Sequence, residues 1–328
     1  GIVSFSMVGL GLGAAATSLL AMLAAHVAPE RKTAAGSLVW ILMIAGLAIS
    51  GITVGQVLDP YSPARLVAVS CAVGAIALTV TCLALRGLER RAVAAAARDD
   101  APRAGFRAAA REVWADPVAR AFTVFVFVSM LAYNTQDLIL EPYAGHVFGM
   151  TPGESTALGG SLHAGALLGM LMVFGAGLLR ASGRLRMGST RVFMIGGCVG
   201  SGLALIALAL GSRHGGAWPL TENVMLLGFM NGVFAVAAIG AMMGLASGGE
   251  KAREGTRMGV FGAAQSLGFA IGASFGAAAL DGLRAVLAET ADAYAAVFLF
   301  EGGLFLVSAL LAARVAGRLA EPARPATT

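Results

Sequence analysis

Charged residues are scarce in this chain, and their scarcity excludes most classes of soluble protein. Asp, Glu, Lys and Arg together make up 12% of the 328 residues, whereas a soluble domain carries about 25%. Hydrophobic residues make up 58% of the chain, and the mean hydropathy is +0.81. This composition predicts a polytopic membrane protein built from apolar helices.

Cysteine is scarce as well, which argues against a disulfide framework or a thiolate metal site. Cys71, Cys82 and Cys198 each stand inside an apolar run, without C-x-x-C spacing, so we expect them to be small packing residues. The sequence also lacks a phosphate-binding loop and a nucleophile–base pattern. We therefore expect no catalytic residues, no metal held directly by the chain, and no enzymatic activity.

Nine apolar runs of about 20 residues are long enough to cross a hydrocarbon core of about 30 Å. They are predicted at 2–25, 35–58, 64–86, 120–141, 156–179, 190–211, 222–246, 256–280 and 293–316. Many of the 45 glycines in the chain recur at four-residue spacing within these runs. Such faces let helix backbones approach closely. The glycines predicted to do so are Gly9, Gly13, Gly51, Gly55, Gly165, Gly169, Gly268, Gly272 and Gly276.

Basic residues alternate between the predicted loops. The loops after the odd-numbered spans, with the C-terminal tail, hold 20 of the 23 Lys and Arg residues. The positive-inside rule places those segments and the C-terminus in the cytoplasm. The net charge of +5 is therefore read as a topology signal, and we expect no nucleic-acid partner.

An internal repeat predicts the architecture. The run around the second span, ERKTAAGSLVWILMIAGLAISGITVG, resembles the run around the eighth, KAREGTRMGVFGAAQSLGFAIGASFG, with Gly51 matching Gly272 and Gly55 matching Gly276. Helices six spans apart and in the same orientation are typical of the major facilitator superfamily (MFS), which consists of two six-helix halves. We expect an all-α, MFS-like bundle in which the nine spans are helices 4–12 of a twelve-helix parent.

This interpretation divides the chain into four parts. Residues 1–86 form the remaining three helices of the N-terminal half, 87–119 a cytoplasmic linker, 120–316 the six-helix C-terminal half, and 317–328 a cytoplasmic tail. Within the linker, Phe106, Val113 and Trp114 are predicted to line the apolar side of a surface-lying amphipathic helix.

Polar side chains interrupt the apolar pattern in the run 131–150. Asn134, Asp137 and Glu141 share one helix face at spacing i, i+3, i+7, and Gln136 and Tyr143 lie nearby. A charged side chain at the bilayer centre costs roughly 2.5–3.5 kcal/mol, so a function is expected. At 1.5 Å per residue, the two carboxylates fall toward the outer face. They form either a hydrated gate or hydrogen-bonded helix end, or a binding point for a partner helix or a pigment. Pro142 is expected to end the straight helix.

Other polar residues are predicted nearer the middle of the membrane. Asn231 and Gln265 are expected to form hydrogen bonds between helices. Glu301 lies on the last span, which is peripheral in MFS folds. A carboxylate there is expected to pair inward, to be protonated, or to face something from the lipid phase, and our hypothesis is that it marks a lateral binding surface for a lipid-soluble ligand or a partner helix. His163 is either a simple hydrogen-bonding residue or an imidazole ligand.

The polar run also carries a family resemblance. The block QD-x3-EPY (Gln136, Asp137, Glu141, Pro142 and Tyr143) followed by VFGM resembles the PucC/LhaA family, as do APERKTAAGSLVW and VGQVLDPYSP. This family comprises MFS-fold proteins that assist the assembly of light-harvesting complexes in phototrophic bacteria. The resemblance extends over essentially the whole chain.

The resemblance implies an assembly factor that handles or delivers bacteriochlorophyll in the bacterial inner or intracytoplasmic photosynthetic membrane. It implies light-harvesting α and β polypeptides as partners, with the core light-harvesting–reaction-centre complex and membrane lipids as further ones. Carotenoid or lipid is a second expected ligand. If pigment is bound, His163 and Glu301 are the candidate axial ligands of its magnesium, and simple hydrogen bonding is the alternative for His163. The alternative is a secondary transporter of a small solute, in which Asp137 and Glu301 would couple proton movement to alternating access.

Overall fold

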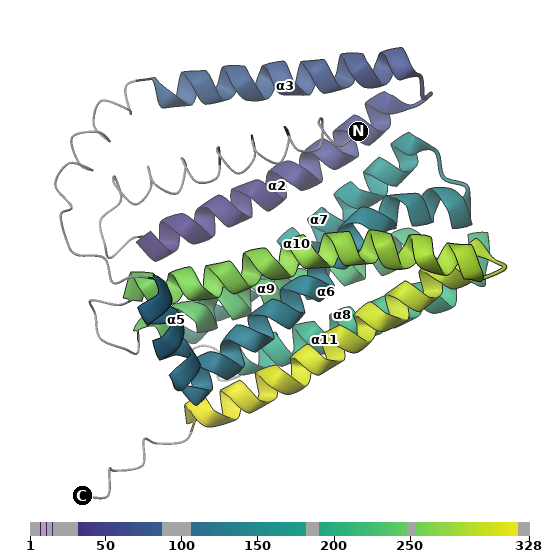
Figure 1. Cartoon of the computed structure of the whole chain (residues 1–328). Helices are drawn as coiled ribbons and strands as arrows, with labels where there is room; N and C mark the ends of the chain where they lie inside the picture. Colours follow the sequence, from purple (N-terminus) through teal and green to yellow (C-terminus); the bar gives the residue numbers. More distant parts are fainter. Residues whose placement is uncertain are drawn as a thin grey trace, which may run out of the picture. The chain divides into compact units, whose positions relative to one another are not determined.

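A computed structural model describes residues 7, 11, 15, 32–86, 106–181, 190–247 and 254–320. Within these ranges the chain forms nine α-helices and one short 3-10 helix (Figure 1). Eight of the described helices are long and apolar enough to cross a membrane. The chain is therefore an all-α, multi-pass membrane protein. Apart from the three single positions, the predicted first span at 2–25 lies outside the described residues.

The eight long helices agree with the other eight predicted spans in order and position. They are α2 (Lys32–Leu58), α3 (Pro63–Leu85), α6 (Pro117–Phe148), α7 (Pro152–Ala181), α8 (Thr190–Gly211), α9 (Leu220–Ser247), α10 (Glu254–Val286) and α11 (Thr290–Ala320). The short elements are α5 (Phe106–Ala115) and the 3-10 helix η2 (Gly215–Ala217).

The chain divides into two compact units, which are described separately. One consists of Gly1–Met43 and Leu66–Arg103, and the other of Ile44–Arg65 and Ala104–Thr328. The second unit thus contains helices α5 to α11 and the C-terminal part of α2. The predicted halves, linker and tail rest on the repeat and the loop charges, and they remain predictions, as does the cytoplasmic side of the C-terminus.

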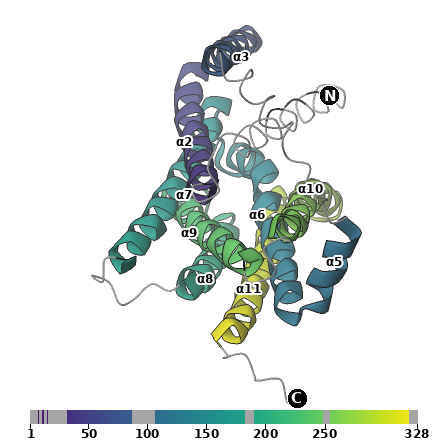
Figure 2. The same ribbon diagram turned by 90° about the vertical axis from the view of Figure 1, so that its left-hand side faces the viewer.

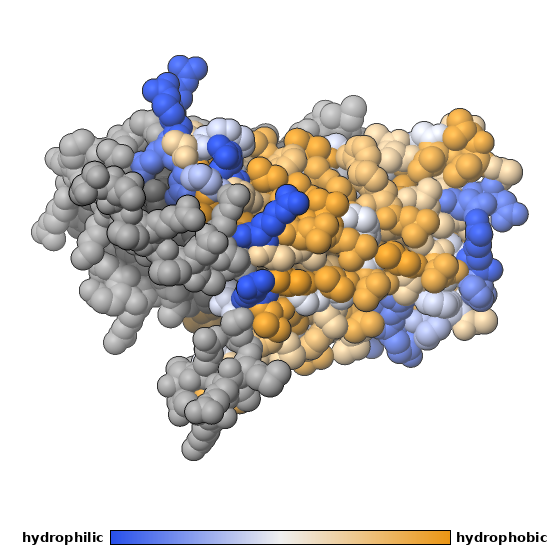
Figure 3. All heavy atoms as spheres, turned by 90° about the horizontal axis from the view of Figure 1, so that it is seen from below, coloured by the Kyte–Doolittle hydropathy of each residue, from blue (hydrophilic) through white to orange (hydrophobic). Residues whose placement is uncertain are grey.

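Helices α6 to α11 pack together in the second unit. Helix α6 contacts α10 and α11, α7 contacts α9, and α8 contacts both α9 and α11 (Figure 2). In the view of Figure 3, hydrophobic residues cover the middle of the described surface, and hydrophilic residues gather toward its ends. This distribution is the one that a hydrocarbon layer between two aqueous phases requires.

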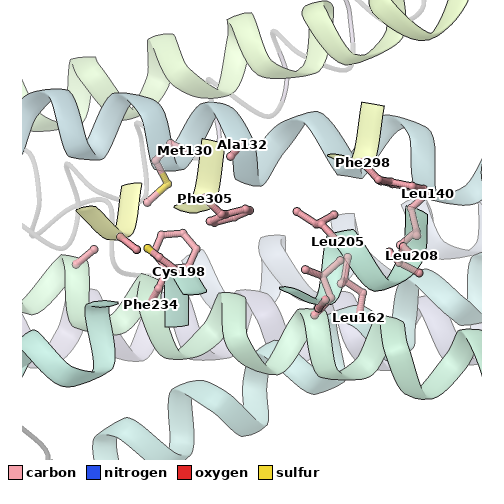
Figure 4. Packing of buried hydrophobic residues seen from close by; sticks show 14 of the residues in the cluster. Met130, Ala132, Leu140, Leu162, Cys198, Leu205, Leu208, Phe234, Phe298 and Phe305 are labelled. Atoms are coloured by element: carbon pink, nitrogen blue, oxygen red, sulfur yellow. The ribbon is translucent and has the colours of Figure 1, made fainter. Parts of the chain in front are cut away.

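The core of this unit is apolar and is formed mainly by α6, α8, α9 and α11. Figure 4 shows Phe234, Phe305 and Cys198 together, with Leu205 and Leu208 farther along the bundle. The rings of Phe234 and Phe305 lie 5.5 Å apart in an edge-to-face arrangement, which aromatic quadrupoles favour. Cys198 is buried here, as expected for a packing residue.

The other two cysteines differ from the prediction. Cys71 and Cys82 are exposed on α3, so neither is packed in a core among the described residues.

Glycines set the closest helix contacts. On α7, a Cβ atom at Gly165 or Gly169 would collide with backbone of α9, and on α10 a Cβ at Gly272 would collide with the carbonyl of Leu131 on α6. Helix α2 meets α7 in the same way, with Gly51 against the backbone of Gly160. The predicted packing role is confirmed for these faces, while Gly9 and Gly13 lie outside the described residues.

The junction of α5 and α6 is fixed by a helix cap. The Asp116 side chain accepts hydrogen bonds from the backbone N–H groups of Val118, at 2.8 Å, and Ala119, at 3.3 Å. Pro117 follows at the first helical position, where its missing N–H costs nothing. The sequence DP therefore ends one helix and begins the next.

Helix α5 is placed against α6 and α10. Val113 is fully buried, whereas Trp114 is 55% exposed. The amphipathic, surface-lying role of this helix stays a prediction. The side chain of Phe106 lies outside the described residues.

Pro142 does not end α6, contrary to the prediction, and the helix continues to Phe148. The helix ends instead at Gly149, which has φ 70°. The N–H of Gly149 bonds to the carbonyl of Gly145, and the N–H of Met150 bonds to that of Ala144. These bonds satisfy terminal carbonyls in the way that a left-handed glycine allows.

Replacing Gly228 by Ala tests the backbone contact between α7 and α9. Its Cβ would collide with the carbonyl of Leu162, and overpacking of this kind costs typically about 1–3 kcal/mol. We expect a clear fall in the melting temperature of the detergent-solubilised protein. Gly240→Ala on the same helix has open space around it and should stabilise by up to about 1 kcal/mol through helix propensity. Equal melting temperatures for the two variants would contradict this account.

Candidate functional site

The second half of α6 presents its polar side chains to three different surroundings. Asp137 and Glu141 are exposed, Asn134 is half-buried, and Gln136 and Tyr143 are fully buried. A helix turns by about 100° per residue, so neighbours in the run QD-x3-EPY face different elements. The residues predicted as one binding group are therefore divided between an open face, a helix contact and the core.

The open face is completed by α7. Glu141 reaches α7 beside Gly159, where an added Cβ would lie 3.3 Å from Glu141 Oε1. Because α6 and α7 run in opposite directions, moving one turn along each helix brings Asp137 level with His163. Consistent with this, Asp137 and His163 interact electrostatically. We call Asp137, Glu141 and His163 the α6–α7 site.

The hydrogen bond of His163 shows which of its two ring nitrogens carries a hydrogen. Its Nδ1 lies 2.8 Å from the carbonyl oxygen of Gly159. A carbonyl can only accept, so Nδ1 carries the hydrogen. In the neutral ring the lone pair is then on Nε2, the arrangement found in metal-ligating histidines whose other nitrogen is held by a carbonyl or carboxylate.

Asn134 joins α6 to α10. Its Nδ2 donates to the backbone carbonyl of Phe269 at 2.8 Å. The next residue of α6, Thr135, lies against Gly276 of α10. Asn134 therefore helps to hold a close helix pair.

Tyr143 belongs to the core rather than to an accessible surface. Its hydroxyl donates to the carbonyl of Leu208 at 2.9 Å and accepts from Ser212 Oγ at 3.2 Å. Its ring packs against those of Phe298 and Tyr294, with centroids 4.8 and 5.3 Å away. The tyrosine thus connects α6, α8 and α11 near the end of α6.

Glu301 is also fully buried. It lies within α11 on the face that carries Phe298 and Phe305, which are equally buried. The expected lateral surface is therefore not found at this residue, because the repeating face Tyr294, Phe298, Glu301, Phe305 turns inward.

The two amides predicted to pack between helices differ in burial. Asn231 is 1% exposed, and its Oδ1 accepts a hydrogen bond from Ser201 Oγ of α8 at 2.7 Å. Gln265 is half-buried on α10.

The α6–α7 site is not a metal site by itself. Among the described residues, no group of three or more His, Cys, Asp and Glu side chains could hold a metal ion.

Sequence reasoning missed the residues that complete these contacts. Ser201 and Ser212 are small and lie in runs that look uniformly apolar. Asp59 accepts a hydrogen bond from Thr151 Oγ1 at 2.8 Å and so ties the end of α2 to the start of α7. The spacing Thr151–Glu154, a capping box confirmed by their reciprocal hydrogen bonds, was the available signal for that helix start.

Comparison with known proteins identifies the family. The family model described as "PUCC protein" matches residues 1–319. The chain belongs to the PucC family. The resemblance seen in QD-x3-EPY is thereby confirmed.

Three relatives show the range of similarity within the PucC family. The chain is 48% identical over 315 residues to the "Bacteriochlorophyll synthase 44.5 kDa chain" of Rhodobacter capsulatus, covering 96% of this chain and 71% of that protein. It is 26% identical to "Protein PucC" of the same organism and 28% identical to "Protein PucC" of Rhodovulum sulfidophilum. The last two matches cover 86% of this chain and 60% of each relative.

Tyr143→Phe separates a structural role from the predicted binding role. The variant loses the hydroxyl that bonds to Leu208 and Ser212, a loss of about 0.5–1.5 kcal/mol. We expect a lower melting temperature in detergent, with unchanged retention of bacteriochlorophyll on purification. Tyr61→Phe, at a residue 48% exposed, is the control and should change neither. Loss of pigment from Tyr143→Phe without loss of stability would instead support direct binding.

Proposed function

We propose that this PucC-family protein is a membrane-embedded assembly factor for bacterial light-harvesting complexes. Its specific task is to handle bacteriochlorophyll and deliver it to the antenna α and β polypeptides. Three facts support the proposal: membership of the PucC family, a relative whose printed name refers to bacteriochlorophyll, and an imidazole with an available Nε2 beside an exposed acidic face.

His163 is the residue we assign to the pigment. Bacteriochlorophyll supplies a magnesium ion that accepts an axial nitrogen or oxygen ligand. Nδ1 of His163 is held by the carbonyl of Gly159, which orients the ring and raises the basicity of Nε2. No equivalent exists at Glu301, because that carboxylate is enclosed by the core.

Asp137 and Glu141 have a second role in this proposal. Both are exposed on α6, and helix bounds place them in the half of α6 that ends at Gly149. A partner helix that presents a hydrogen-bond donor or a basic side chain near that membrane face would be oriented by the two carboxylates. Carotenoid and lipid remain secondary ligands that apolar surfaces can accommodate.

Replacing His163 by Leu is the direct test. The wild-type protein and variants would be purified gently from a phototrophic host, and the bacteriochlorophyll-to-protein ratio measured by absorption. We expect His163→Leu to lower this ratio roughly tenfold or more, since loss of a ligand costs at least as much as loss of its supporting hydrogen bond.

His214 provides a matched control. Its Nδ1 makes the same type of bond to a carbonyl four residues back, that of Leu210 at 2.9 Å, but it is exposed in the turn after α8 and lies near Trp218. His214→Leu should keep the wild-type ratio. An unchanged ratio in His163→Leu would overturn the assignment of His163. Wild-type protein that carries neither pigment nor antenna polypeptides, but catalyses proton-dependent solute flux, would favour the transporter alternative.

We also propose that the protein is not an enzyme, although the name of one relative contains the word synthase. Incubation of the purified protein with bacteriochlorophyll precursors should yield no new pigment. Supplying finished bacteriochlorophyll should instead raise the yield of assembled antenna complex in membranes. Turnover of a precursor by the purified chain would contradict this part of the proposal.

A further inference from the structure

Four helices of the second unit place a polar side chain at one level of the bundle. Tyr143 of α6 contacts Tyr294 of α11, and these helices run in opposite directions. Gln136 lies seven residues before Tyr143, and Glu301 lies seven residues after Tyr294. Two turns are about 10.5 Å on each helix, so Gln136 and Glu301 lie level with each other across the α6–α11 contact.

Helices α8 and α9 add the other two members. Helix α8 crosses α11 at Gly202 and Gly302, where a Cβ on either glycine would lie 3.0 Å from the other's carbonyl oxygen. Ser201 and Glu301 each precede one of these glycines. Ser201 in turn donates to Asn231 of α9. We call Gln136, Ser201, Asn231 and Glu301 the polar layer.

Apolar residues enclose the polar layer on both sides. Figure 4 shows two groups of apolar side chains along the bundle, one with Phe305, Phe234, Cys198, Met130 and Ala132, and the other with Phe298, Leu205, Leu208, Leu140 and Leu162. In sequence the polar layer falls between the two groups, with Ser201 between Cys198 and Leu205 and Glu301 between Phe298 and Phe305. Each member of the layer is separated by about one turn from such residues in both directions along its own helix. All four members are at most 1% exposed.

Five polar atoms of this layer have no hydrogen-bond partner among the described residues. They are Gln136 Nε2, Gln136 Oε1, Asn231 Nδ2, Glu301 Oε1 and Glu301 Oε2. Leaving a buried polar group without a partner destabilises the fold, and leaving a charged group without one destabilises it more. A stable core therefore needs something that satisfies them together.

The donor or acceptor character of these five atoms shows which hydrogen-bonding group the layer still needs. The two amide nitrogens are donors, and the two oxygens of Glu301 can accept from them. Gln136 Oε1 is an acceptor that remains without a donor, because an ionised carboxylate offers none. One proton on Glu301 supplies that donor and also removes the charge from an apolar core.

We propose that the polar layer is a proton-binding site, in which Glu301 holds one proton and donates it in a hydrogen bond to Gln136 Oε1. Gln136 Nε2 and Asn231 Nδ2 donate to the carboxyl oxygens of Glu301. The amide of Gln136 and the acid of Glu301 thus pair through two parallel hydrogen bonds after small side-chain rotations. This arrangement satisfies all five atoms and joins α6, α9 and α11 through one proton.

The proposal includes a route for exchange of this proton along α6. Asp137 follows Gln136 in the chain, is exposed, and lies near enough for its charge to act on Glu301. Its charge also acts together with that of His163 of α7. Helix α10 contributes Asp281 and Arg284 at the N-terminal end of α11, where they act on Tyr294. In this proposal Asp137 passes a proton between the accessible face and Glu301, the proton leaving one carboxyl oxygen and binding another.

A bound cation is the main competing explanation for a buried carboxylate. It would use the oxygens of Glu301, Gln136 and Ser201, but the N–H groups of Gln136 and Asn231 would then stay unpaired. The balance of hydrogen-bond donors and acceptors therefore favours a bound proton over a bound cation. The proposal is independent of pigment handling, and its failure would leave the assignment of His163 unaffected.

Infrared difference spectroscopy of the purified full chain tests the proposal. At neutral pH the wild-type protein should show the carbonyl stretch of a protonated carboxylic acid, and Glu301→Gln should lose it. Glu222→Gln, at an exposed glutamate in the first turn of α9, should leave the band unchanged. If the wild-type band is absent, or survives in Glu301→Gln, the proton site is wrong.

Two further variants test the partner and the route. Gln136→Leu should shift the band to higher frequency, because the acid loses its amide partner, and this readout remains available if Glu301→Gln fails to fold. Asp137→Asn should retain the band but slow its hydrogen–deuterium exchange by about tenfold or more, the effect of removing a positioned proton-transfer group. An unshifted band in Gln136→Leu would overturn the pairing, and unchanged exchange in Asp137→Asn would overturn the route.

A stability measurement separates the proton from a sodium ion. Glutamine at position 301 reproduces the donor and acceptor of a protonated glutamate, so Glu301→Gln should melt within a few degrees of the Glu222→Gln control. The melting temperature of the wild-type protein should not depend on whether sodium or a large organic cation is present. A sodium-dependent melting temperature that Glu301→Gln abolishes would overturn the proposal in favour of a cation site.

Discussion

Direct contact between helix backbones is the constraint on which the second unit depends. In a lipid environment, apolar side chains gain little by leaving the solvent for a helix interface, so helices associate through close packing and interhelical hydrogen bonds. Gly165 and Gly228 allow α7 and α9 to meet in this way, and Gly272 does the same for α10 against α6. These contacts fix the rotation of each helix, and the rotation decides which polar side chains are buried and which are open.

The rotation of α6 about its own axis decides which of its polar side chains are buried and which remain open. With Gly268, Gly272 and Gly276 of α10 pressed against one side of α6, Gln136 and Tyr143 point into the core. Asp137 and Glu141 are then left on an open face beside His163. The same glycine contacts occupy the small-residue faces within the bundle. Large apolar side chains stand on the outer surface, for example Leu310 at 65% exposure and Leu203 at 57%.

Much of this fold could be predicted from the sequence, because length and hydropathy are local properties. The span expected at 190–211 coincides with α8, and glycine spacing identified real helix contacts. The prediction for Pro142 was wrong because the end of a helix depends on its cap, here Gly149, as much as on a residue that weakens the ladder.

The candidate site was less predictable, because it depends on which elements meet. Asp137 and Glu141 were recognisable as costly residues, but their proximity to His163 depends on the antiparallel packing of α6 and α7. Glu301 was expected at a lipid-facing surface from the usual place of the last helix in the fold. Its burial follows from the inward face that it shares with Phe298 and Phe305, and only the packed structure shows that face covered by α6 and α8.

The crossing of α8 and α11 has a consequence for how this sequence can vary. At Gly202 and Gly302 the nearest atom of the opposite helix is a backbone carbonyl oxygen, with the side chains of Leu306 and Ile206 slightly farther away. A backbone atom cannot be made smaller by a compensating substitution, whereas a side chain can. At core positions such as Leu205 and Phe298, a larger side chain can be compensated by a smaller neighbouring one. No such compensation is possible at the two glycines, so the distance between α8 and α11 is fixed there. The neighbouring residues Ser201 and Glu301 are therefore held at fixed positions in the bundle.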